Sequence, residues 1–303
     1  MEKKYKLTDE TIGFEGKTLY RIEALKDFGE IKKGDKGGFI ASENNLAHEG
    51  DAWVSDNAWV YGSACVYGDA CVFGCACVYD NAWVSGNGKV YGNARVYGSA
   101  HVCRNACVYD YTRVCDNACV SGNARVYNHA CVYGDAWLYN NACVYGNASV
   151  SDNARVCGNA RVYGDANVCD DSSVFGSALV YDNARVSDNS RVCGYARVYD
   201  NARVCGNARV YGNTCVCGST NVCGDAEIST DADYIVFKNW WSSGRYFTWT
   251  RSNNMWSVGC FYGTGEELIK KAYQDSKKSG LEYERIVHYV EDVLKSENNG
   301  KEI

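Results

Sequence analysis

Residues 90–110 read VYGNARVYGSAHVCRNACVYD, and a valine returns at every sixth position of this stretch. The same six-residue period continues without a break from residue 52 to residue 228. In this range, 30 successive sixth positions, starting at Val54, hold an aliphatic residue. The residue two places before each of them is small, and in most units it is alanine. A fixed short period is typical of stacked identical units that bury their apolar faces against their neighbours. The sequence therefore predicts a solenoid.

Each six-residue unit combines a strand residue with a corner. Valine is β-branched and suits a strand, and a pair such as Gly92-Asn93 tolerates the positive φ that a sharp corner requires. Asparagine recurs at the corner, as at Asn87 and Asn105. We expect stacked coils to join these side chains in a hydrogen-bonded ladder.

The residue that follows each valine reveals a longer period. At steps of 18 residues one column is aromatic in eight of its ten positions, whereas the other two columns are aromatic in four of ten each. The aromatic column contains Phe73, Tyr91, Tyr109, Tyr127, Tyr145, Tyr163, Tyr181 and Tyr199. Three units per coil, a triangular prism, explain this excess. Ten coils spaced by about 4.8 Å give a rod on the order of 48 Å long.

The regions on either side of the repeat are predicted to close the ends of the rod, because an open end would expose unpaired strand edges. Residues 1–50 read as an N-terminal cap with short strands over 5–7, 11–14 and 18–22, followed by a glycine-rich loop over 29–38. Residues 51–230 form the repeat. Residues 231–303 read as an α+β module with strands over 234–238, 245–250 and 255–260, a helix capped by Thr264, and a second amphipathic helix.

The repeat resembles the hexapeptide-repeat left-handed parallel β-helix, and the resemblance, not the spacing, implies the handedness. The whole chain also resembles an uncharacterised group of bacterial and phage-borne repeat proteins that carry a transferase label, the YdcK-like group. The matching segments are LYRIEALKDFG at 19–29, residues 37–40, the Asn-Ala-Arg-Val-Tyr-Gly repeats, and FTWTRSNNMWSVGCFYGTGEE at 247–267. This resemblance implies a phage or mobile-element setting.

Composition narrows the class of protein. The net charge of −6 argues against a generally basic nucleic-acid coat, and we see no secretory signal and no membrane span, so we expect a cytoplasmic protein. The 18 cysteines interchange with Tyr, Ser and Arg at repeat positions, which favours free thiols, although Cys205 and Cys223 are placed to stack on adjacent coils. There is no CxxC pair to indicate zinc, and we expect neither a metal nor a cofactor.

Acyl transfer is one candidate activity, because the resemblance implies a histidine general base near a loop that leaves the helix. The chain has four histidines, and His101 is the better candidate within the repeat, while His129 replaces a corner residue. No insertion interrupts the repeat to build such a loop. We therefore expect a protein without catalysis, with an acyl-CoA-dependent transferase as the alternative.

Binding along the aromatic column is the second candidate. The predicted stripe combines the tyrosines with the arginines one valine away: Tyr91, Tyr109, Tyr127, Tyr145, Tyr163, Tyr181, Tyr199, Arg125, Arg161 and Arg197. Tyrosine and arginine are typical anchors of protein interfaces, and they can also stack bases and pair with phosphates. A purely structural alternative is that the rings stabilise the coils while the arginines pair with corner acids such as Asp165, Asp182 and Asp200.

The C-terminal module is the third candidate for a functional site, because it contains more aromatic residues than are needed to cover the end of the rod. We predict an interface there formed by Trp240, Trp241, Arg245, Trp249, Arg251, Trp256 and Tyr262. Cys260 has no histidine near it in sequence and is expected to be a buried thiol. These features favour a homo-oligomeric binding protein that sequesters or inhibits a host or phage protein, with a nucleotide or nucleic-acid binder as a further alternative.

Overall fold

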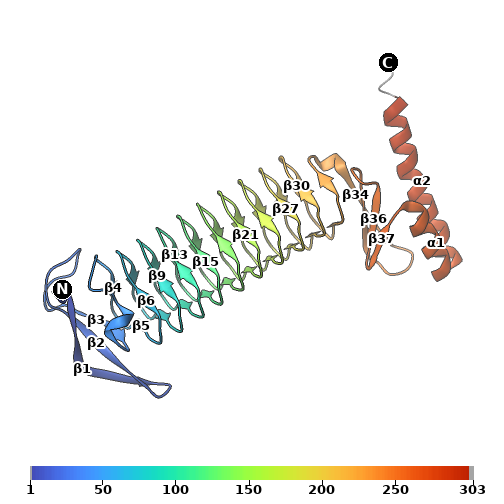
Figure 1. Ribbon diagram of the computed structural model, residues 1–303. Coiled ribbons are helices and arrows are strands. Elements are labelled where there is room, and N and C mark those ends of the chain that lie inside the picture. Colours follow the sequence, from blue (N-terminus) through green and yellow to red (C-terminus); the bar gives the residue numbers. More distant parts are fainter. Residues whose placement is uncertain (1, 300–303) are drawn as a thin grey trace.

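The computed structural model describes residues 2–299 and shows a rod with a β-hairpin at one end and two helices at the other (Figure 1). Residue 1 and residues 300–303 of the two predicted end regions lie outside the described range. The fold is the expected mainly β, three-sided parallel solenoid with an 18-residue coil. Each coil contributes one two-residue strand to each of three sheets.

The three sheets run the length of the rod. Sheet 1 contains β4 (Trp53–Val54), β7 (Cys71–Val72), β10 (Lys89–Val90), β13 (Cys107–Val108), β16 (Arg125–Val126), β19 (Cys143–Val144), β22 (Arg161–Val162), β25 (Leu179–Val180), β28 (Arg197–Val198) and β31 (Cys215–Val216). Sheet 2 contains β1 (Tyr5–Phe14), β2 (Lys17–Ala24), β3 (Lys36–Ile40), β5 (Trp59–Val60), β8 (Cys77–Val78), β11 (Arg95–Val96), β14 (Arg113–Val114), β17 (Cys131–Val132), β20 (Ser149–Val150), β23 (Asn167–Val168), β26 (Arg185–Val186), β29 (Arg203–Val204) and β32 (Asn221–Val222). Sheet 3 contains β6 (Cys65–Val66), β9 (Trp83–Val84), β12 (His101–Val102), β15 (Cys119–Val120), β18 (Trp137–Leu138), β21 (Arg155–Val156), β24 (Ser173–Val174), β27 (Arg191–Val192), β30 (Arg209–Val210) and β33 (Glu227–Ile228).

The core is made of the repeated aliphatic and small residues. The valines at the sixth positions and the alanines two places before them are fully buried, and Leu138 fills a valine position in the same way. Burying a valine side chain contributes roughly 1.5–3 kcal/mol. Because each coil stacks on the next in register, the core is one continuous column inside the rod.

The corners are held by two polar ladders. The first corner residue has positive φ, as at Gly92 and Asp188, and an aspartate there accepts a hydrogen bond from the backbone of the next coil. The second ladder is the predicted one, since Asn87 donates to Asn105 and Asn105 to Asn123 at 3.0 and 3.1 Å. The asparagine ladder inferred from the sequence is thus confirmed.

The N-terminal region is a β-hairpin, β1 and β2, followed by β3, which pairs in parallel with β5. The expected loop over 29–38 is wrong at its end, because Lys36–Ile40 is a strand. A Cβ at Gly38 would lie 2.6 Å from the Ala58 carbonyl oxygen, so the glycine that reads as a loop residue instead allows β3 to pack closely on the first coil.

The C-terminal module is a four-stranded antiparallel sheet, sheet 4, covered by two helices on the side away from the rod (Figure 1). Its strands are β34 (Tyr234–Lys238), β35 (Tyr246–Thr250), β36 (Met255–Val258) and β37 (Phe261–Gly263), and its helices are α1 (Gly265–Asp275) and α2 (Lys277–Asn299). The short strand β37 was not predicted. Thr264 caps α1 by accepting from the Glu267 N–H, which confirms the predicted helix start.

Side-chain oxygens of the C-terminal region bind the free N–H groups at the end of the rod. The first residue in the last strand of each sheet has no next coil to donate to. The N–H of Cys215 donates to Asp231 at 2.8 Å, that of Asn221 to Thr248 at 3.0 Å, and that of Glu227 to Ser252 at 2.7 Å. At the other end, Lys4 donates to the Ala52 carbonyl and Asn45 to the Ala64 carbonyl. Polar side chains from both flanking regions therefore satisfy backbone groups at the ends of the rod.

One pair of cysteines departs from the expected free thiols. Cys205 and Cys223 are joined by a disulfide, with their Cα atoms 4.7 Å apart on adjacent coils, and the other 16 cysteines are free. Two cysteines occupy neighbouring positions of the same outward column only at this pair, which explains why this bridge forms. Within residues 2–299, no helix has the length and apolar character that crossing a bilayer requires.

The corner aspartate gives a test of the fold. Asp188 has φ of 58° and accepts from the Gly206 N–H at 2.9 Å. Asp188→Ala keeps the unfavourable backbone conformation and loses the hydrogen bond, so we expect a loss of about 1–3 kcal/mol in the free energy of unfolding, measured by urea denaturation. Asp188→Gly also loses the hydrogen bond, but glycine adopts the positive φ without strain, so this variant should be less destabilised by about 1 kcal/mol. Equal stability of the two variants would contradict this account of the corner.

Candidate functional site

The aromatic column of sheet 1 is a continuous stack. From Phe73 to Tyr199, each ring lies parallel to the ring of the next coil, with centroids 4.7–5.0 Å apart and planes within 1–4° of each other. This spacing equals that of neighbouring strands, so the coil register sets the distance between the rings. Each aromatic contact contributes roughly 0.5–1.5 kcal/mol beyond area burial. The column therefore stabilises the rod, as the structural reading of the sequence expects.

Most tyrosine hydroxyls of this column and the three arginines of this sheet lack side-chain partners within the described chain, whereas Tyr199 hydrogen-bonds to Cys217. Among residues 2–299, the hydroxyls of Tyr91 through Tyr181 in the column make no side-chain hydrogen bond, and no carboxylate lies within 4.0 Å of the guanidinium groups of Arg125, Arg161 and Arg197. The predicted pairing of these arginines with corner acids is therefore not present. We call the column tyrosines and these three arginines the Tyr/Arg face.

The arginines of the Tyr/Arg face are exposed and lie on alternate coils. Cys143 separates Arg125 from Arg161, and Leu179 separates Arg161 from Arg197. On sheets 2 and 3 the pattern differs, because Arg95 stacks directly on Arg113 and Arg191 on Arg209. Like charges on adjacent strands are destabilising, and sheet 1 avoids that cost. Sheet 1 is thus chemically distinct from the other two faces, as predicted.

Burial changes the acidity of the column tyrosines. The pKa values of Tyr91, Tyr109, Tyr127, Tyr145, Tyr163 and Tyr181 are raised above 10.0, because the half-buried phenols are desolvated. Arg161 opposes this rise at Tyr127, Tyr145 and Tyr163, which shows that its positive charge acts on the neighbouring rings. The column is therefore neutral at physiological pH.

Neither histidine of the rod is held as a general base. His101 is exposed on sheet 3 and contacts the Trp83 ring at 5.2 Å, while the ring of His129 stacks on Tyr111 at 5.1 Å. Within residues 2–299 neither imidazole hydrogen-bonds to another side chain. General-base catalysis needs an oriented imidazole, and these two histidines have no group that orients them.

The predicted C-terminal interface is split between the core and the surface of the module. Trp241, Trp249 and Trp256 are buried, and Phe247 packs among them, so these three tryptophans are core residues and not surface anchors. They are buried because sheet 4 needs an apolar face toward the helices.

The remaining members of that set reach the surface. Trp240 is 73% exposed, Tyr262 is 42% exposed, and Arg245 is also exposed. Arg251 pairs with Glu297 at 2.7 Å, and the Tyr262 hydroxyl donates to the Cys223 carbonyl of the rod. Of the residues predicted to form the C-terminal interface, Trp240 and Arg245 are therefore the two exposed ones that form neither an ion pair nor a hydrogen bond to the rod through their side chains within residues 2–299.

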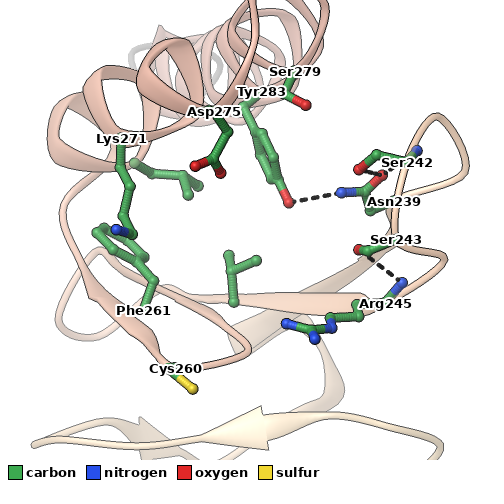
Figure 2. Close-up of a pocket in the computed structure, with 13 residues that line it drawn as sticks. Asn239, Ser242, Ser243, Arg245, Cys260, Phe261, Lys271, Asp275, Ser279 and Tyr283 are labelled. Atoms are coloured by element: carbon green, nitrogen blue, oxygen red, sulfur yellow. Dashed lines mark hydrogen bonds between the residues drawn. The ribbon is translucent and has the colours of Figure 1, made fainter.

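A cavity of about 410 Å³ lies between sheet 4 and the two helices (Figure 2). Asn239 donates to the Tyr283 hydroxyl at 3.0 Å and accepts from Ser242 at 3.0 Å, which fixes the polar wall. Lys271 and Asp275 project from α1 on the opposite side. The volume lies in the range of small-molecule pockets.

The cavity holds no pair of nucleophile and base. Cys260 lies at its rim and is exposed, so the expectation of a buried thiol is wrong: the residue falls in the turn between β36 and β37. No histidine lines the cavity. Asn239, Lys271 and Tyr283 were not singled out from the sequence, because they are dispersed over three elements and only the fold brings them together.

These features define a β-solenoid with one distinctive face and an α+β end module. Residues 89–104, 154–170, 178–194 and 202–218 match the family model of the YdcK beta solenoid repeat, which confirms the resemblance seen in the sequence. A search of curated proteins gave no match.

A solved structure that is similar is the X-ray crystal structure of a "putative acetyltransferase" from Bacillus cereus. It is 9% identical, the similarity covers 71% of this chain and 99% of that chain, and the TM-score is 0.25. At this identity and this TM-score, the similarity is not an argument for acetyltransferase activity of this chain.

The raised pKa values of the column tyrosines generate a pH prediction. The phenols stay protonated in the fold above the pH of about 10 at which unfolded tyrosine ionises. The stabilisation is therefore fully present below pH 10 and is lost as pH rises above it. We expect tyrosinate absorbance of the native protein to show a group of tyrosines that titrate at higher pH than the tyrosines of the unfolded protein. A single titration that matches the protein in guanidinium would contradict the burial of the column.

Proposed function

We propose that the protein is a non-catalytic binding protein that holds a protein partner, including a second copy of itself, on the Tyr/Arg face. The observation that carries this proposal is the row of tyrosine hydroxyls from Tyr91 to Tyr181 and of arginine guanidinium groups that, within residues 2–299, have no side-chain partner on a rigid sheet. A protein of this kind acts by occupying its target. We propose sequestration of a host component as its role.

A preformed face reduces the cost of binding. The stacked rings are already ordered, so a partner does not have to immobilise them. Tyrosine supplies a large contact area together with a hydroxyl, and arginine supplies up to five donors in a fixed geometry. These two residue types are enriched among the residues that dominate binding energy at protein interfaces.

The geometry of the column favours a protein partner over a nucleic acid. Base stacking needs an exposed ring face, but each inner ring of the column is covered on both faces by its neighbours about 4.9 Å away. In addition, Asp110 and Asp182 lie at the corner beside the column, where their carboxylates repel a phosphate backbone. The edges and hydroxyls of the rings suit the polar and apolar groups of a protein surface.

The alternative of acyl transfer has less support. From Val54 to Ile228 the strands follow one another at constant spacing, and no loop leaves the rod. His101 lies on sheet 3, away from the Tyr/Arg face, with no side chain that hydrogen-bonds to its imidazole among residues 2–299. Binding therefore explains the unpaired groups of sheet 1 better than catalysis does.

Charge reversal on one face tests the proposal. The variant with Arg125→Glu and Arg161→Glu keeps the aromatic column but reverses two charges of the Tyr/Arg face. We expect this variant to lose a partner that the wild-type protein retains in a pull-down from its native host, and to lose any assembly that light scattering detects above 33.4 kDa. A loss of affinity of about tenfold or more is the expected size.

The matched control is the variant with Arg95→Glu and Arg113→Glu, which reverses two exposed arginines on sheet 2. This control should retain the partner. Equal binding by both double variants would refute the assignment of the Tyr/Arg face. If labelled oligonucleotides bind in a salt-dependent way and Arg161→Glu abolishes that binding, the partner is a nucleic acid and not a protein. If the protein turns over acetyl-CoA and His101→Ala abolishes the turnover, the non-catalytic role is contradicted.

A further inference from the structure

We infer that the protein binds the phosphate group of a small phosphate monoester in the cleft between the last coils of sheet 2 and sheet 4. This site is separate from the Tyr/Arg face, and its failure would leave the binding role of that face untouched. The cleft has a volume of about 360 Å³. Its walls include Asn201, Arg203 and Ser219 of the rod and Arg245, Tyr246 and Ser257 of the C-terminal module.

Two guanidinium groups line the cleft without a counter-ion. Arg203 stands on β29, and Arg245 precedes β35. Over residues 2–299, neither forms an ion pair within 4.0 Å, and neither guanidinium donates a hydrogen bond to another side chain or to the backbone. None of the residues that line the cleft carries a carboxylate. The lining of the cleft is therefore positively charged.

A third arginine, which does not itself line the cleft, lies on the coil before Arg203. Arg185 is the register partner of Arg203 on the preceding coil, so two like charges stack on adjacent strands. Such stacking is destabilising unless a negative charge neutralises it. A bound dianion at Arg203 would reduce this repulsion.

Nearby carboxylates are already engaged with the backbone. Asp200 and Asp231 lie in the adjoining groove. Asp200 accepts from the Gly218 N–H at 2.9 Å, and Asp231 accepts from the Cys215 N–H at 2.8 Å. Among residues 2–299 neither acid lies within 4.0 Å of the guanidinium group of Arg203 or Arg245, so neither is a direct counter-ion of the two arginines.

The backbone at Gly259 allows Arg245 to reach this position. A Cβ at residue 259 would lie 3.1 Å from Nη1 of Arg245, closer than ordinary van der Waals contact. The guanidinium therefore rests on the glycine, in the turn that follows β36. Figure 2 shows Arg245 extending along the strand toward this turn.

The remaining donors of the cleft fit a phosphate monoester. Arginine matches phosphate oxygens with two parallel hydrogen bonds. Among residues 2–299 the side chains of Asn201 and Ser219 have no hydrogen-bond partner, so they are free to donate. The cleft exceeds the size of a phosphate ion, and the ring of Tyr246 is 44% exposed beside it. This ring offers a flat surface to the organic part of the ligand, such as a nucleoside.

The test is isothermal titration calorimetry at low ionic strength with adenosine monophosphate, inorganic phosphate and adenosine as probes. We expect both phosphate-bearing probes to bind and adenosine to bind at least tenfold more weakly than the monophosphate. Arg203→Gln and Arg245→Gln should each weaken binding of adenosine monophosphate by about tenfold or more, because each removes charge-assisted hydrogen bonds. Both side chains are exposed, so the variants should keep the circular dichroism spectrum of the wild type.

Arg191→Gln on sheet 3 is the matched control, since Arg191 is also exposed and also stacks on an arginine but does not line the cleft. It should leave binding unchanged. Absence of binding by adenosine monophosphate and phosphate at millimolar concentration would overturn the inference. Binding that persists in the double variant Arg203→Gln and Arg245→Gln would also overturn it, as would acetate binding as tightly as phosphate.

Discussion

The hydrogen bond from a backbone N–H to the carbonyl 17 residues later, as from Trp53 to Ala70 at 2.9 Å, fixes the register on which the rest of the molecule depends. Each strand of the coils has only two residues, so one faces the core and the other faces outward. A slip of one residue would expose every valine and bury the charged neighbours, at a cost that no alternative contact offsets. The repeat therefore specifies a single register, and every column of side chains follows from it.

The columns give this simple rod its chemical variety. Because residues 18 apart stack at the strand spacing, a tyrosine at one outward position becomes a continuous aromatic stack, and an asparagine at a corner becomes a hydrogen-bonded ladder. Arginine is more frequent in the C-terminal half of the rod, and there Arg203 lines the same cleft as Arg245 of the end module. The Tyr/Arg face and the cleft at the junction thus arise from one constraint but present different chemistry.

The sequence alone was sufficient where a feature repeats, because a period shows which residues share an environment. The valine core, the 18-residue coil and the stacked column from Phe73 to Tyr199 were all predictable in this way. Single features were not predictable. Gly38 reads as a loop residue but permits close packing of β3, and Trp249 reads as an anchor but fills the core of the end module. The cleft residues Arg203 and Arg245 lie 42 positions apart, and no local pattern joins them.

A single substitution tests the register most directly. Ser151 stands 18 residues before Cys169 in the column of sheet 2 that also holds the bridged pair Cys205 and Cys223. The account predicts that Ser151→Cys, after mild oxidation, yields a disulfide between position 151 and Cys169 in a peptide map by mass spectrometry. The native bridge serves as the internal control. Coupling of position 151 to Cys143 or Cys157, or no coupling there while the native pair is oxidised, would contradict the 18-residue coil.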